Sequence, residues 1–421
     1  MTVTRNIKAH YLIETAHPLE KAAESMAGEQ SSGTFVKVPG ETEELKEKHA
    51  ARVEAIEDLG EVEKPALSGS KPPKNTDHPV YRRAYVTLRW PFANVGANLP
   101  NLMATVAGNL FELSAFSGLK LLDIEIPEEF KKKYPGPQFG TEGTRELSGV
   151  YDRPVIGTII KPSVGLTPQA TAAQVKTLIE AGLDFIKDDE LMGDSPHSPF
   201  EQRVRHVMDE INRYADKTGK KPMFAFNVSG DIDDMLYRHD YVLEMGGTCV
   251  MVSLNWAGIS GVTKLRKHSQ LPIHGHRNGW GMFTRAEVLG MEFKAYQKVY
   301  SLAGVDHLHT NGIRNKFCES DASVISSIKA CLQPQNGGYP VMPVVSSGQW
   351  AEQALDTYKA VQSTDLMYLC GGGITGHPGG LAAGVRSIQQ AWEGAVQGKS
   401  IDDLAPQHPE LQEAIDFYQK K

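Results

Sequence analysis

The sequence predicts an α/β protein in which a smaller α+β domain precedes a (β/α)8 TIM barrel. Two observations lead to this expectation. The chain has 421 residues and is 40% apolar, which is enough for two domains with buried cores. From about residue 150, short apolar runs alternate with amphipathic stretches, and eight such runs within about 270 residues match the count and size of a TIM barrel.

The first domain is expected to span residues 1–145 and to mix strands with helices. Residues 7–13 and 81–91 alternate in polarity as strands do, and residues 19–28 and 99–110 have helical periodicity. Residues 43–58 are rich in Glu, Lys and Ala, which predicts an exposed helix. Residues 66–78, rich in Pro, Ser and Lys, are expected to form a connection.

The barrel domain is expected to span residues 146–421. Its strands are predicted at residues 155–160, 185–186, 223–226, 249–252, 272–273, 307–309, 344–345 and 366–369. Helices are predicted at residues 167–181, 199–217, 286–302 and 351–360. A doubly wound sheet is less well supported, because its Gly-rich first turn is missing.

Composition argues against several classes of function. The net charge of −7 does not favour nucleic acid or an anionic membrane as a partner, and we find no apolar run of membrane-spanning length. The four cysteines are scattered without a Cys-x-x-Cys pair, which disfavours a disulfide framework or a zinc site. The start of the sequence lacks the features of a signal peptide. We therefore expect a cytoplasmic protein.

Polar residues collect at the carboxyl ends of the predicted strands, where a barrel carries its catalytic side chains. The second run leads into Lys187, Asp189 and Glu190, and this group indicates a site for a hard divalent cation such as Mg²⁺. A neutralised acidic loop is the alternative. Lys161 follows the first run and is either an acid/base residue or an ordinary surface lysine.

Several other groups at the same ends are candidates for binding an anion: Arg277, His309, Lys316, Ser346, and the glycines Gly348, Gly371 and Gly372. The glycines after the last strand could equally serve only a tight turn. His274 and His307 are expected to be structural, with His307 pointing away from His309. A cation, an anion site and an acid/base lysine together fit enolate chemistry, in which the cation polarises a carbonyl.

At this point the residues resemble a known family. Residues 157–162 (Gly-Thr-Ile-Ile-Lys-Pro) and 182–190 (Gly-Leu-Asp-Phe-Ile-Lys-Asp-Asp-Glu) resemble the large chain of ribulose-bisphosphate carboxylase, RuBisCO. The likeness continues at His276-Arg277, in Asp306-His307-Leu308-His309, at Lys316, Ser346 and Gly348, in residues 371–378, and in the first domain at Glu29, Thr34 and Gly108-Asn109. The resemblance implies a ferredoxin-like first domain, a barrel of the RuBisCO large-chain type, and a homodimer or higher homo-oligomer without a small subunit.

The resemblance also implies a role for each matched residue. Lys187 would react with CO₂, the activator, to form a carbamate, and this carbamate would bind Mg²⁺ together with Asp189 and Glu190. Lys161 would act as acid and base at an enediolate, and His276 and Lys316 would be further catalytic residues. Asn109 would support the substrate. One anion site would comprise Arg277, His309 and Ser346, and the other Thr34, Lys316, Gly348, Gly371 and Gly372. Glu29, Thr34 and Asn109 would reach the barrel of a neighbouring subunit.

Departures from the family pattern decide the expected activity. Ser163 stands where a true carboxylase has a second lysine, and Phe35 and Trp280 replace an expected tryptophan and histidine. The loop before Lys316 reads Asn-Gly-Ile-Arg-Asn rather than a stretch rich in valine and glycine. We therefore expect a RuBisCO-like protein, similar to the branch that acts on 3-oxo-isoapionate 4-phosphate, and decarboxylation is the simplest reaction.

Alternatives remain open at the level of the sequence. A transcarboxylase/hydrolase reaction on the same substrate would use the same residues. A methylthioribulose-phosphate isomerase or enolase of methionine salvage would need the metal and Lys161 but would release no CO₂. Carboxylation of ribulose bisphosphate is not expected, because Ser163 removes a cation. A barrel kept only as a binding module would leave the intact metal ligands without a purpose.

Overall fold

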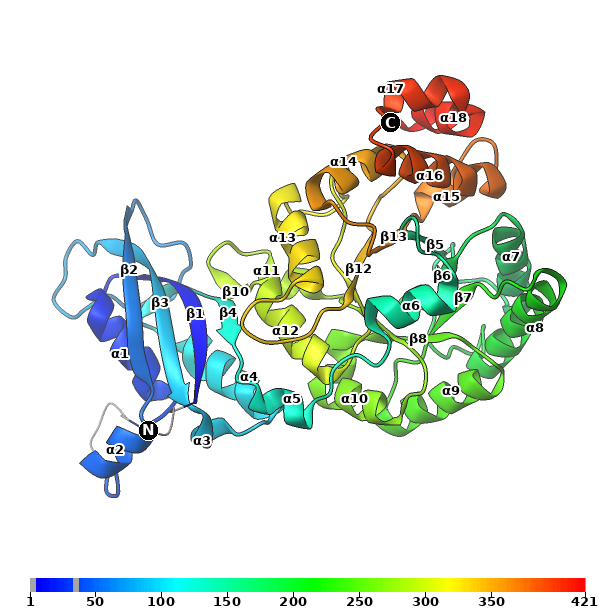
Figure 1. Cartoon of the computed structure of the whole chain (residues 1–421). Coiled ribbons are helices and arrows are strands. Elements are labelled where there is room, and N and C mark those ends of the chain that lie inside the picture. Colours follow the sequence, from blue (N-terminus) through cyan, green and yellow to red (C-terminus); the bar gives the residue numbers. More distant parts are fainter. Residues whose placement is uncertain (1–4, 33–37, 421) are drawn as a thin grey trace. The chain divides into compact units, whose positions relative to one another are not determined.

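The computed structural model describes residues 5–32 and 38–420. The chain forms two compact units, which can be followed by colour in Figure 1. The first unit comprises Met1–Gly136, Gly279–Leu302 and Pro334–Tyr339, and the second comprises Pro137–Asn278, Ala303–Gln333 and Pro340–Lys421. Two segments that lie late in the sequence therefore belong to the first unit.

The first unit is built on a five-stranded sheet with the order β10-β4-β1-β3-β2. Its strands are β1 (Asn6–Thr15), β2 (Arg52–Val62), β3 (Tyr81–Pro91), β4 (Phe116–Glu125) and β10 (Leu289–Met291). Strand β1 lies in the middle, and its alternate residues Ile7, Ala9, Tyr11 and Ile13 are fully buried. This burial follows from the period of two in a strand, and the strands predicted at residues 7–13 and 81–91 are confirmed.

The exposed helix predicted at residues 43–58 is wrong in its second half. Helix α2 (Glu43–His49) ends at Ala50, whose backbone is extended, and residues 52–62 form the edge strand β2. Ion pairs with its neighbour β3 explain how so charged a segment forms a strand, since Arg82 bonds Asp58 at 2.6 Å and Glu61 at 3.1 Å. Cross-strand pairs of opposite charge stabilise a sheet, and charged edge strands resist aggregation.

The other helices that begin in the first unit are α1 (Leu19–Glu29), α3 (Phe92–Val95), α4 (Leu99–Ala107), η1 (Asn109–Glu112), α5 (Glu129–Lys133), α11 (Trp280–Thr284) and α12 (Phe293–Ala303). Helix α4 starts where the Asn98 side chain accepts a hydrogen bond from the Asn101 N–H, a standard N-cap. The helix predicted at residues 286–302 is only partly correct. Residues 289–291 form β10 instead, which pairs with β4 in parallel.

The second unit contains a closed barrel of eight parallel strands, in the order β11-β12-β13-β5-β6-β7-β8-β9 (Figure 1). The strands are β5 (Val155–Ile159), β6 (Phe185–Lys187), β7 (Met223–Asn227), β8 (Cys249–Ser253), β9 (Ile273–His276), β11 (His307–His309), β12 (Met342–Val345) and β13 (Met367–Leu369). All eight predicted strands are present, which confirms the TIM barrel. Ile159 pairs with Lys187 and Lys187 with Ala225, so the residues that follow these strands emerge at one rim.

The helices of the second unit are α6 (Gly140–Ser148), α7 (Pro168–Glu180), α8 (Phe200–Thr218), α9 (Ile232–Glu244), α10 (Leu254–His268), α13 (Asp321–Leu332), α14 (Glu352–Val361), α15 (Gly372–Thr375), α16 (Leu381–Val396), α17 (Ile401–Leu404), η2 (Ala405–Gln407) and α18 (Pro409–Tyr418). Helix α8 shows why they pack on the strands. Its residues Phe200, Val204, Val207 and Ile211 share one face and are buried. The helix ends at Gly219, whose φ of 74° suits glycine.

A cluster of apolar side chains from most of the strands forms the core of the barrel. Phe185, Met223, Met251 and Met367 belong to it and are fully buried. Burial of one such side chain stabilises the fold by about 1.5–3 kcal/mol. This packed layer supports the rim at which the polar groups lie.

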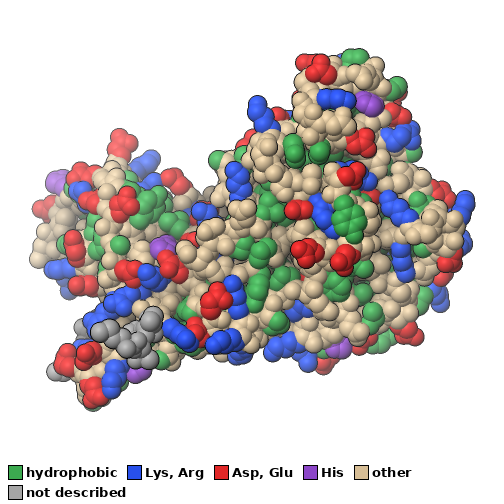
Figure 2. Space-filling model, in the orientation of Figure 1, with side chains coloured by type: hydrophobic (Ala, Val, Ile, Leu, Met, Phe, Trp, Pro, Cys, Tyr) green, Lys and Arg blue, Asp and Glu red, His purple; other side chains and the backbone are tan. Residues whose placement is uncertain are grey.

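Acidic and basic side chains alternate over the face of the molecule seen in Figure 2. Within the described residues, none of the helices has the length and apolar character needed to cross a membrane.

Candidate active site

The site is organised around the carboxyl end of β6, where Lys187 is 1% exposed. Its Nζ donates a hydrogen bond to the carbonyl oxygen of Asp188 at 2.7 Å. Burial lowers the pKa of Lys187 to about 8, although the charges of Glu190, Asp189 and Asp188 act in the opposite direction. With this pKa about a tenth of the amine is neutral at pH 7, far more than for an ordinary lysine, and only the neutral form is nucleophilic.

Lys161 lies beside the same centre. Its Nζ bonds Oδ2 of Asp189 and the hydroxyl of Ser163, each at 2.6 Å. Burial would raise the pKa of Asp189, but the hydrogen bond from Lys161 and further interactions outweigh it, so that pKa is lowered. The Lys161 side chain is 40% exposed, so its ammonium group is held in a defined position and remains open to solvent or a ligand.

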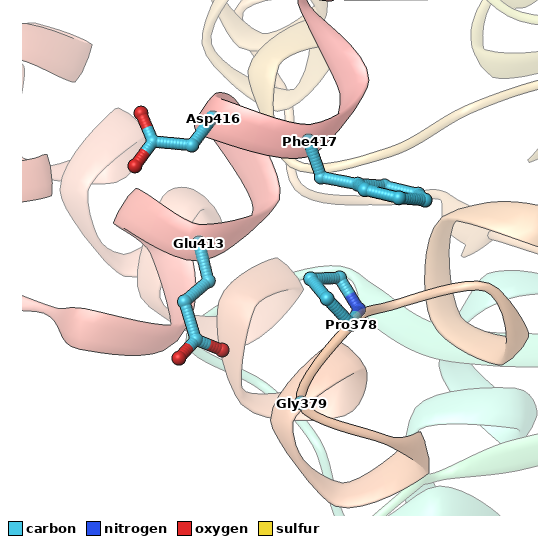
Figure 3. A pocket seen from close by; sticks show the side chains of 5 residues that line it. All are labelled: Pro378, Gly379, Glu413, Asp416 and Phe417. Atoms are coloured by element: carbon cyan, nitrogen blue, oxygen red, sulfur yellow. The ribbon is translucent and has the colours of Figure 1, made fainter.

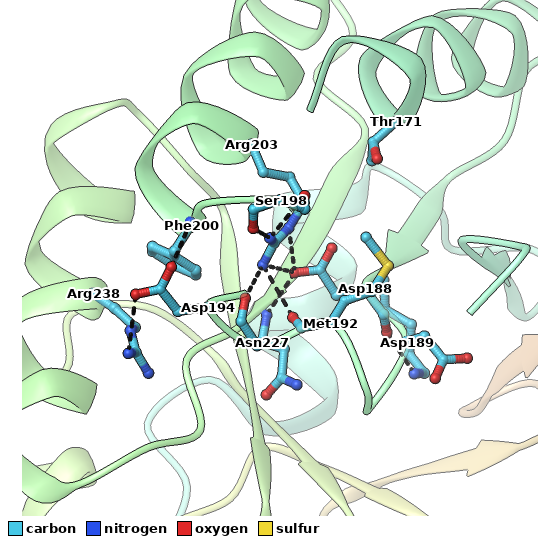
Figure 4. Close-up of polar contacts among 12 residues, drawn as sticks. Thr171, Asp188, Asp189, Met192, Asp194, Ser198, Phe200, Arg203, Asn227 and Arg238 are labelled. Atoms are coloured by element: carbon cyan, nitrogen blue, oxygen red, sulfur yellow. Dashed lines mark hydrogen bonds and ion pairs between the residues drawn. The ribbon is translucent and has the colours of Figure 1, made fainter. Parts of the chain in front are cut away.

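Arg203 supports this centre from helix α8 (Figure 4), and it was not among the residues predicted from the sequence. Both its side chain and that of Asp188 are fully buried, and Nη2 of Arg203 lies 3.2 Å from Oδ2 of Asp188. The same oxygen accepts the backbone N–H of Asn227 at 2.9 Å. Burial raises the pKa of Asp188, against the effect of Arg203. The pair fixes the backbone between Lys187 and Asp189.

Glu190 and His276 close the acidic centre on the side of β9. Nε2 of His276 lies 3.5 Å from Oε2 of Glu190. Nδ1 of His276 accepts the backbone N–H of Asn278 at 3.2 Å, so in the neutral ring the proton is on Nε2, facing Glu190. Burial lowers the pKa of His276 to about 3, which keeps the ring neutral. The Asn227 amide donates to the Glu190 carbonyl oxygen at 3.1 Å.

The donor set fits a hard divalent cation. Carboxylate oxygens are the ligands that Mg²⁺ prefers, and Asp189 and Glu190 follow the same strand. An ammonium group already lies 2.6 Å from Asp189, which shows that this carboxylate attracts positive charge. Oδ1 of Asp188 is buried and has no hydrogen-bond partner among the described residues. Asp189, Glu190 and a carbamate on Lys187 are the groups that would hold the ion.

A chain of hydrogen-bonded histidines runs beside this centre. His274 contacts His307 through the two Nδ1 atoms at 3.2 Å and His309 through the two Nε2 atoms at 2.8 Å. Nδ1 of His309 meets the hydroxyl of Ser346 at 3.2 Å, and Nε2 of His307 meets the hydroxyl of Thr144 at 2.7 Å. Burial lowers the pKa of all three rings, that of His307 to about 3.

The hydroxyl of Thr144 determines the direction of this chain. It donates its proton to the Gly140 carbonyl oxygen, so it accepts from His307. His307 then accepts from His274, His274 from His309, and His309 from Ser346. The structural role expected for His274 and His307 agrees with this bonding. The expectation that His307 points away from His309 is wrong, because residues two apart in a strand share a face.

The residues expected to bind an anion lie in two groups. Nη2 of Arg277 bonds Oε2 of Glu319 at 2.7 Å, and the sequence did not single out Glu319. Lys316 follows β11, and its backbone N–H bonds the Ser347 carbonyl oxygen at 3.2 Å. Gly348 has a φ of 88°, a conformation that favours glycine, and a Cβ there would lie 3.5 Å from Cβ of Lys316. Around Gly372 a Cβ would meet nothing within 4 Å, so that backbone is open.

The candidates from the first unit are less informative. Glu29 ends helix α1 and Asn109 begins η1, and both are exposed. Thr34 lies outside the described residues. Their expected role at a neighbouring subunit therefore stays a prediction.

Two other features of the second unit do not compete with this site. A surface hollow of about 360 Å³ is lined by Pro378, Gly379, Glu413, Asp416 and Phe417 (Figure 3), none of which follows a barrel strand. His239, Asp240 and His268 also lie close together. However, Nε2 of His239 accepts the Gln270 N–H at 3.3 Å, so its proton is on Nδ1, which faces Asp240 at 2.9 Å. That ring therefore has no lone pair to offer a metal at the cluster.

Comparison with known proteins identifies the family. Residues 140–418 match the ribulose bisphosphate carboxylase large chain, catalytic domain, and residues 4–130 match its N-terminal domain. The chain is 50% identical to a 3-oxo-isoapionate-4-phosphate transcarboxylase/hydrolase of Xanthobacter autotrophicus, covering 99% of this chain and 100% of that one. It is 46% identical to a 3-oxo-isoapionate-4-phosphate decarboxylase of Rhizobium etli, covering 96% and 97%.

Solved structures agree with this result. A rubisco-like protein from Burkholderia fungorum superimposes with a TM-score of 0.91 at 44% identity, covering 98% of this chain and 99% of that one. A dimeric archaeal Rubisco from Hyperthermus butylicus superimposes with a TM-score of 0.85 at 27% identity, covering 99% and 97%. The barrel, the lysine-carboxylate centre at its rim and these matches lead to one conclusion: the chain belongs to the RuBisCO large-chain family.

Proposed function

We propose that the protein is a Mg²⁺-dependent RuBisCO-like enzyme that decarboxylates 3-oxo-isoapionate 4-phosphate through an enediolate. The observation that carries this proposal is the arrangement of two lysines at one acidic centre. Lys187 is buried there, and among the described residues its Nζ bonds a carbonyl oxygen and no carboxylate. Nζ of Lys161 lies 2.6 Å from Asp189, and its side chain is partly exposed. One amine is suited to modification and the other to proton transfer.

The buried amine of Lys187 is proposed to react with CO₂. Its lone pair attacks the carbon, one N–H proton leaves, and a carbamate forms, which replaces a cation by an oxygen donor. The lowered pKa of Lys187 supports this step, because it makes the neutral amine available. The carbamate and the carboxylates of Asp189 and Glu190 would then form a set of oxygen ligands for Mg²⁺.

The bond that breaks is the one between the carboxylate carbon and the rest of the β-keto acid. Bound Mg²⁺ would supply positive charge that stabilises the developing enediolate. When CO₂ departs, the electron pair of that bond remains on the substrate, and the ammonium of Lys161 donates a proton to the carbon. Ser163 holds Lys161 in position, because its hydroxyl oxygen accepts from Nζ at 2.6 Å. His276, whose Nε2–H faces Glu190, and Lys316 are proposed to assist in binding and orientation.

Ser163 also argues against carboxylation of ribulose bisphosphate. The resemblance places a second lysine at this position in true carboxylases, whereas the serine is neutral and bonds Lys161. The site therefore has one positive charge fewer near the reacting carbons. A CO₂-fixation assay that yields phosphoglycerate from ribulose bisphosphate would contradict this part of the proposal.

The proposed assembly is a homodimer or higher homo-oligomer in the cytoplasm, without a small subunit, nucleic acid or membrane as partner. The dimeric archaeal Rubisco that this chain resembles supports a homo-oligomer. Glu29, Thr34 and Asn109 would then complete the barrel mouth of a neighbouring subunit.

A transcarboxylase/hydrolase reaction is the second candidate. It is supported by the relative of that name, which is 50% identical to the chain, slightly above the 46% of the decarboxylase. Both reactions begin by breaking the same carbon–carbon bond. They differ in whether the released CO₂ is recaptured at another carbon before the chain is hydrolysed.

Product analysis by NMR tests these candidates. The protein, Mg²⁺ and bicarbonate are mixed with 3-oxo-isoapionate 4-phosphate. CO₂ and a four-carbon ketose phosphate would support decarboxylation, whereas phosphoglycerate with glycolate would establish the transcarboxylase/hydrolase. An untouched substrate would overturn the proposal and turn attention to the phosphorylated methylthiopentoses of methionine salvage. Lys161→Met should reduce turnover at least about 100-fold, and Lys176→Met, an exposed lysine on α7, serves as the matched control.

A further inference from the structure

Glu319 places a carboxylate among residues that were expected to bind an anion. It lies just before helix α13, and its side chain is only 9% exposed. Its Oε2 accepts from Nη2 of Arg277 at 2.7 Å and from the Asn311 amide at 2.6 Å, and its Oε1 accepts from the Ser323 hydroxyl at 2.9 Å. Three donors from three segments therefore hold this carboxylate in place.

The same network reaches the other residues of that expected anion site. The Ser347 hydroxyl donates to the side-chain oxygen of Asn311 at 2.7 Å and lies 3.4 Å from the Ser346 hydroxyl. Ser346 in turn donates to His309. Arg277, Ser346 and His309 are thus connected, and Glu319 lies between the first of them and the other two.

The charges of this group leave little attraction for an incoming anion. Arg277 is 5% exposed and already paired with a carboxylate, so the two charges cancel. The Ser346 proton is committed to His309, and both ring nitrogens of His309 are engaged. A phosphate brought to this place would have to displace Glu319 or lie beside it, and like charges in a buried site repel strongly.

The second expected anion site, around Lys316, Gly371 and Gly372, differs from the first in its charge. Within the described residues Lys316 forms no ion pair with a carboxylate, and its Nζ lies 5.3 Å from the centre of the Phe317 ring. A Cβ on Gly372 would meet nothing within 4 Å among the described residues, and one on Gly371 would meet Cδ1 of Ile159 at 3.8 Å, an ordinary contact distance. One side of the site therefore keeps an unpaired cation and open backbone, and the other side has a cation that is already neutralised.

We propose that Glu319 is a specificity-determining residue: by pairing with Arg277 it restricts the site to substrates that carry one phosphate, held on the side of Lys316 and Gly372. The neutralised side receives hydroxyl groups instead of a second phosphate. This inference deepens the proposed function and rests on it for the place of the substrate. It predicts that the enzyme accepts a substrate with one phosphate group and binds a bisphosphate poorly at this site.

Binding of two commercial sugar phosphates tests the inference without any turnover. Calorimetry with Mg²⁺ and bicarbonate compares ribulose 5-phosphate with ribulose 1,5-bisphosphate. The wild type should bind both within about threefold of each other, and Glu319→Gln should bind the bisphosphate at least about tenfold more tightly while leaving the monophosphate unchanged. Glu352→Gln removes a carboxylate that pairs with Arg314 in the same region at 3.5 Å and should leave both affinities unchanged.

Two results would overturn the inference: a wild type that binds the bisphosphate about 100-fold more tightly than the monophosphate, or a Glu319→Gln variant with the same ratio as the wild type. If Glu319→Gln does not fold, the ratio of bisphosphate to monophosphate affinity in the wild type and in Glu319→Ala still tests the inference. The outcome is separate from that of the product analysis. An untouched 3-oxo-isoapionate 4-phosphate with the expected ratio would remove the proposed function and keep the role of Glu319.

Discussion

Lys187 and Lys298 are both buried lysines, one in each compact unit, and their surroundings differ. Lys187 is 1% exposed and Lys298 is 2% exposed, and burial lowers the pKa of each. Lys298 bonds the Asp123 carboxylate at 2.6 Å and the Ile124 carbonyl oxygen at 2.7 Å. Lys187 has three carboxylates in its neighbourhood, yet its bond is to a carbonyl oxygen.

The difference lies in where the carboxylates are directed. Asp188 is bonded to Arg203, Asp189 to Lys161, and Glu190 faces His276. Each acid near Lys187 thus has another donor, which leaves the amine buried with little compensation. Burying a charge without a paired partner costs stability, and such costs are typically found at functional sites. Both lysines are buried, so the lack of a dedicated counter-ion, and not burial, is what supports the proposed role of Lys187.

The largest effect is expected for Lys187→Met, which tests whether Lys187 differs in role from Lys298. It should reduce turnover at least about 1000-fold, because the proposed carbamate ligand of Mg²⁺ is lost. The pKa of Lys187 falls from 10.5 to about 8 on folding, so its protonated form destabilises the fold at pH 7 by about 3 kcal/mol. This contribution is unfavourable because, between pH 8 and pH 10.5, the unfolded state binds more protons than the folded state. Below pH 8 both states are protonated and the full cost is present.

Urea unfolding of the metal-free protein at pH 7 checks this expectation. Lys187→Met should unfold at the same or a higher urea concentration than the wild type. A clear loss of stability, or turnover near that of the wild type, would show that Lys187 is a structural lysine like Lys298.

Lys298→Met should lower stability although burial lowers the pKa of this lysine too, because its ammonium group has a carboxylate partner. The substitution removes the lysine donor from the Asp123 carboxylate, which keeps the Ile124 N–H at 2.8 Å, and from the Ile124 carbonyl oxygen, so the free energy of unfolding should fall by about 2 kcal/mol. Turnover per folded molecule should stay within about twofold of the wild type, since changes away from a site mainly affect stability. Parallel unfolding and activity measurements on both methionine variants test the comparison. Loss of turnover in a stable, folded Lys298→Met protein would undermine it.

The barrel and its functional rim could be predicted from the sequence because the signals are local. Each apolar run is a strand. Lys187 is the last residue of β6, and Lys161 and Asp189 come two residues after β5 and β6, so the topology alone brings them to one end. The edge strand β2 could not be predicted in this way. It forms by pairing with β3, and its contacts, such as Arg82–Asp58, join residues 24 positions apart.

The supporting groups of the site were missed for the same reason. Asp188 and Arg203 lie 15 positions apart, and Arg277 and Glu319 lie 42 apart, so nothing in the local sequence indicates that they meet. The chain from Ser346 to Thr144 likewise joins four segments. Sequence periodicity predicts which face a residue occupies, but the partner of a buried charge or ring is a tertiary property.

His307, like the two lysines, is a buried base, but it is buried in its neutral form. Its expected effect on the free energy of unfolding is the smallest of the predicted effects. Burial lowers its pKa from 6.5 to about 3, so between these values the unfolded state binds one proton more than the folded state. Stability is therefore complete above pH 6.5 and falls as the pH drops below it. Between pH 7 and pH 5.5 the ring alone should reduce the free energy of unfolding by about 1 kcal/mol.

The variant His307→Gln isolates this contribution, because glutamine does not titrate and can still donate to the Thr144 hydroxyl. The variant will be less stable at pH 7, but its stability should depend less on pH than that of the wild type. The number of protons taken up on unfolding should be smaller by about one at the acid end of this range. Equal slopes of unfolding free energy against pH would mean that His307 is protonated in the fold. That result would contradict the donor order from Ser346 to Thr144, because a protonated His307 could not accept from His274.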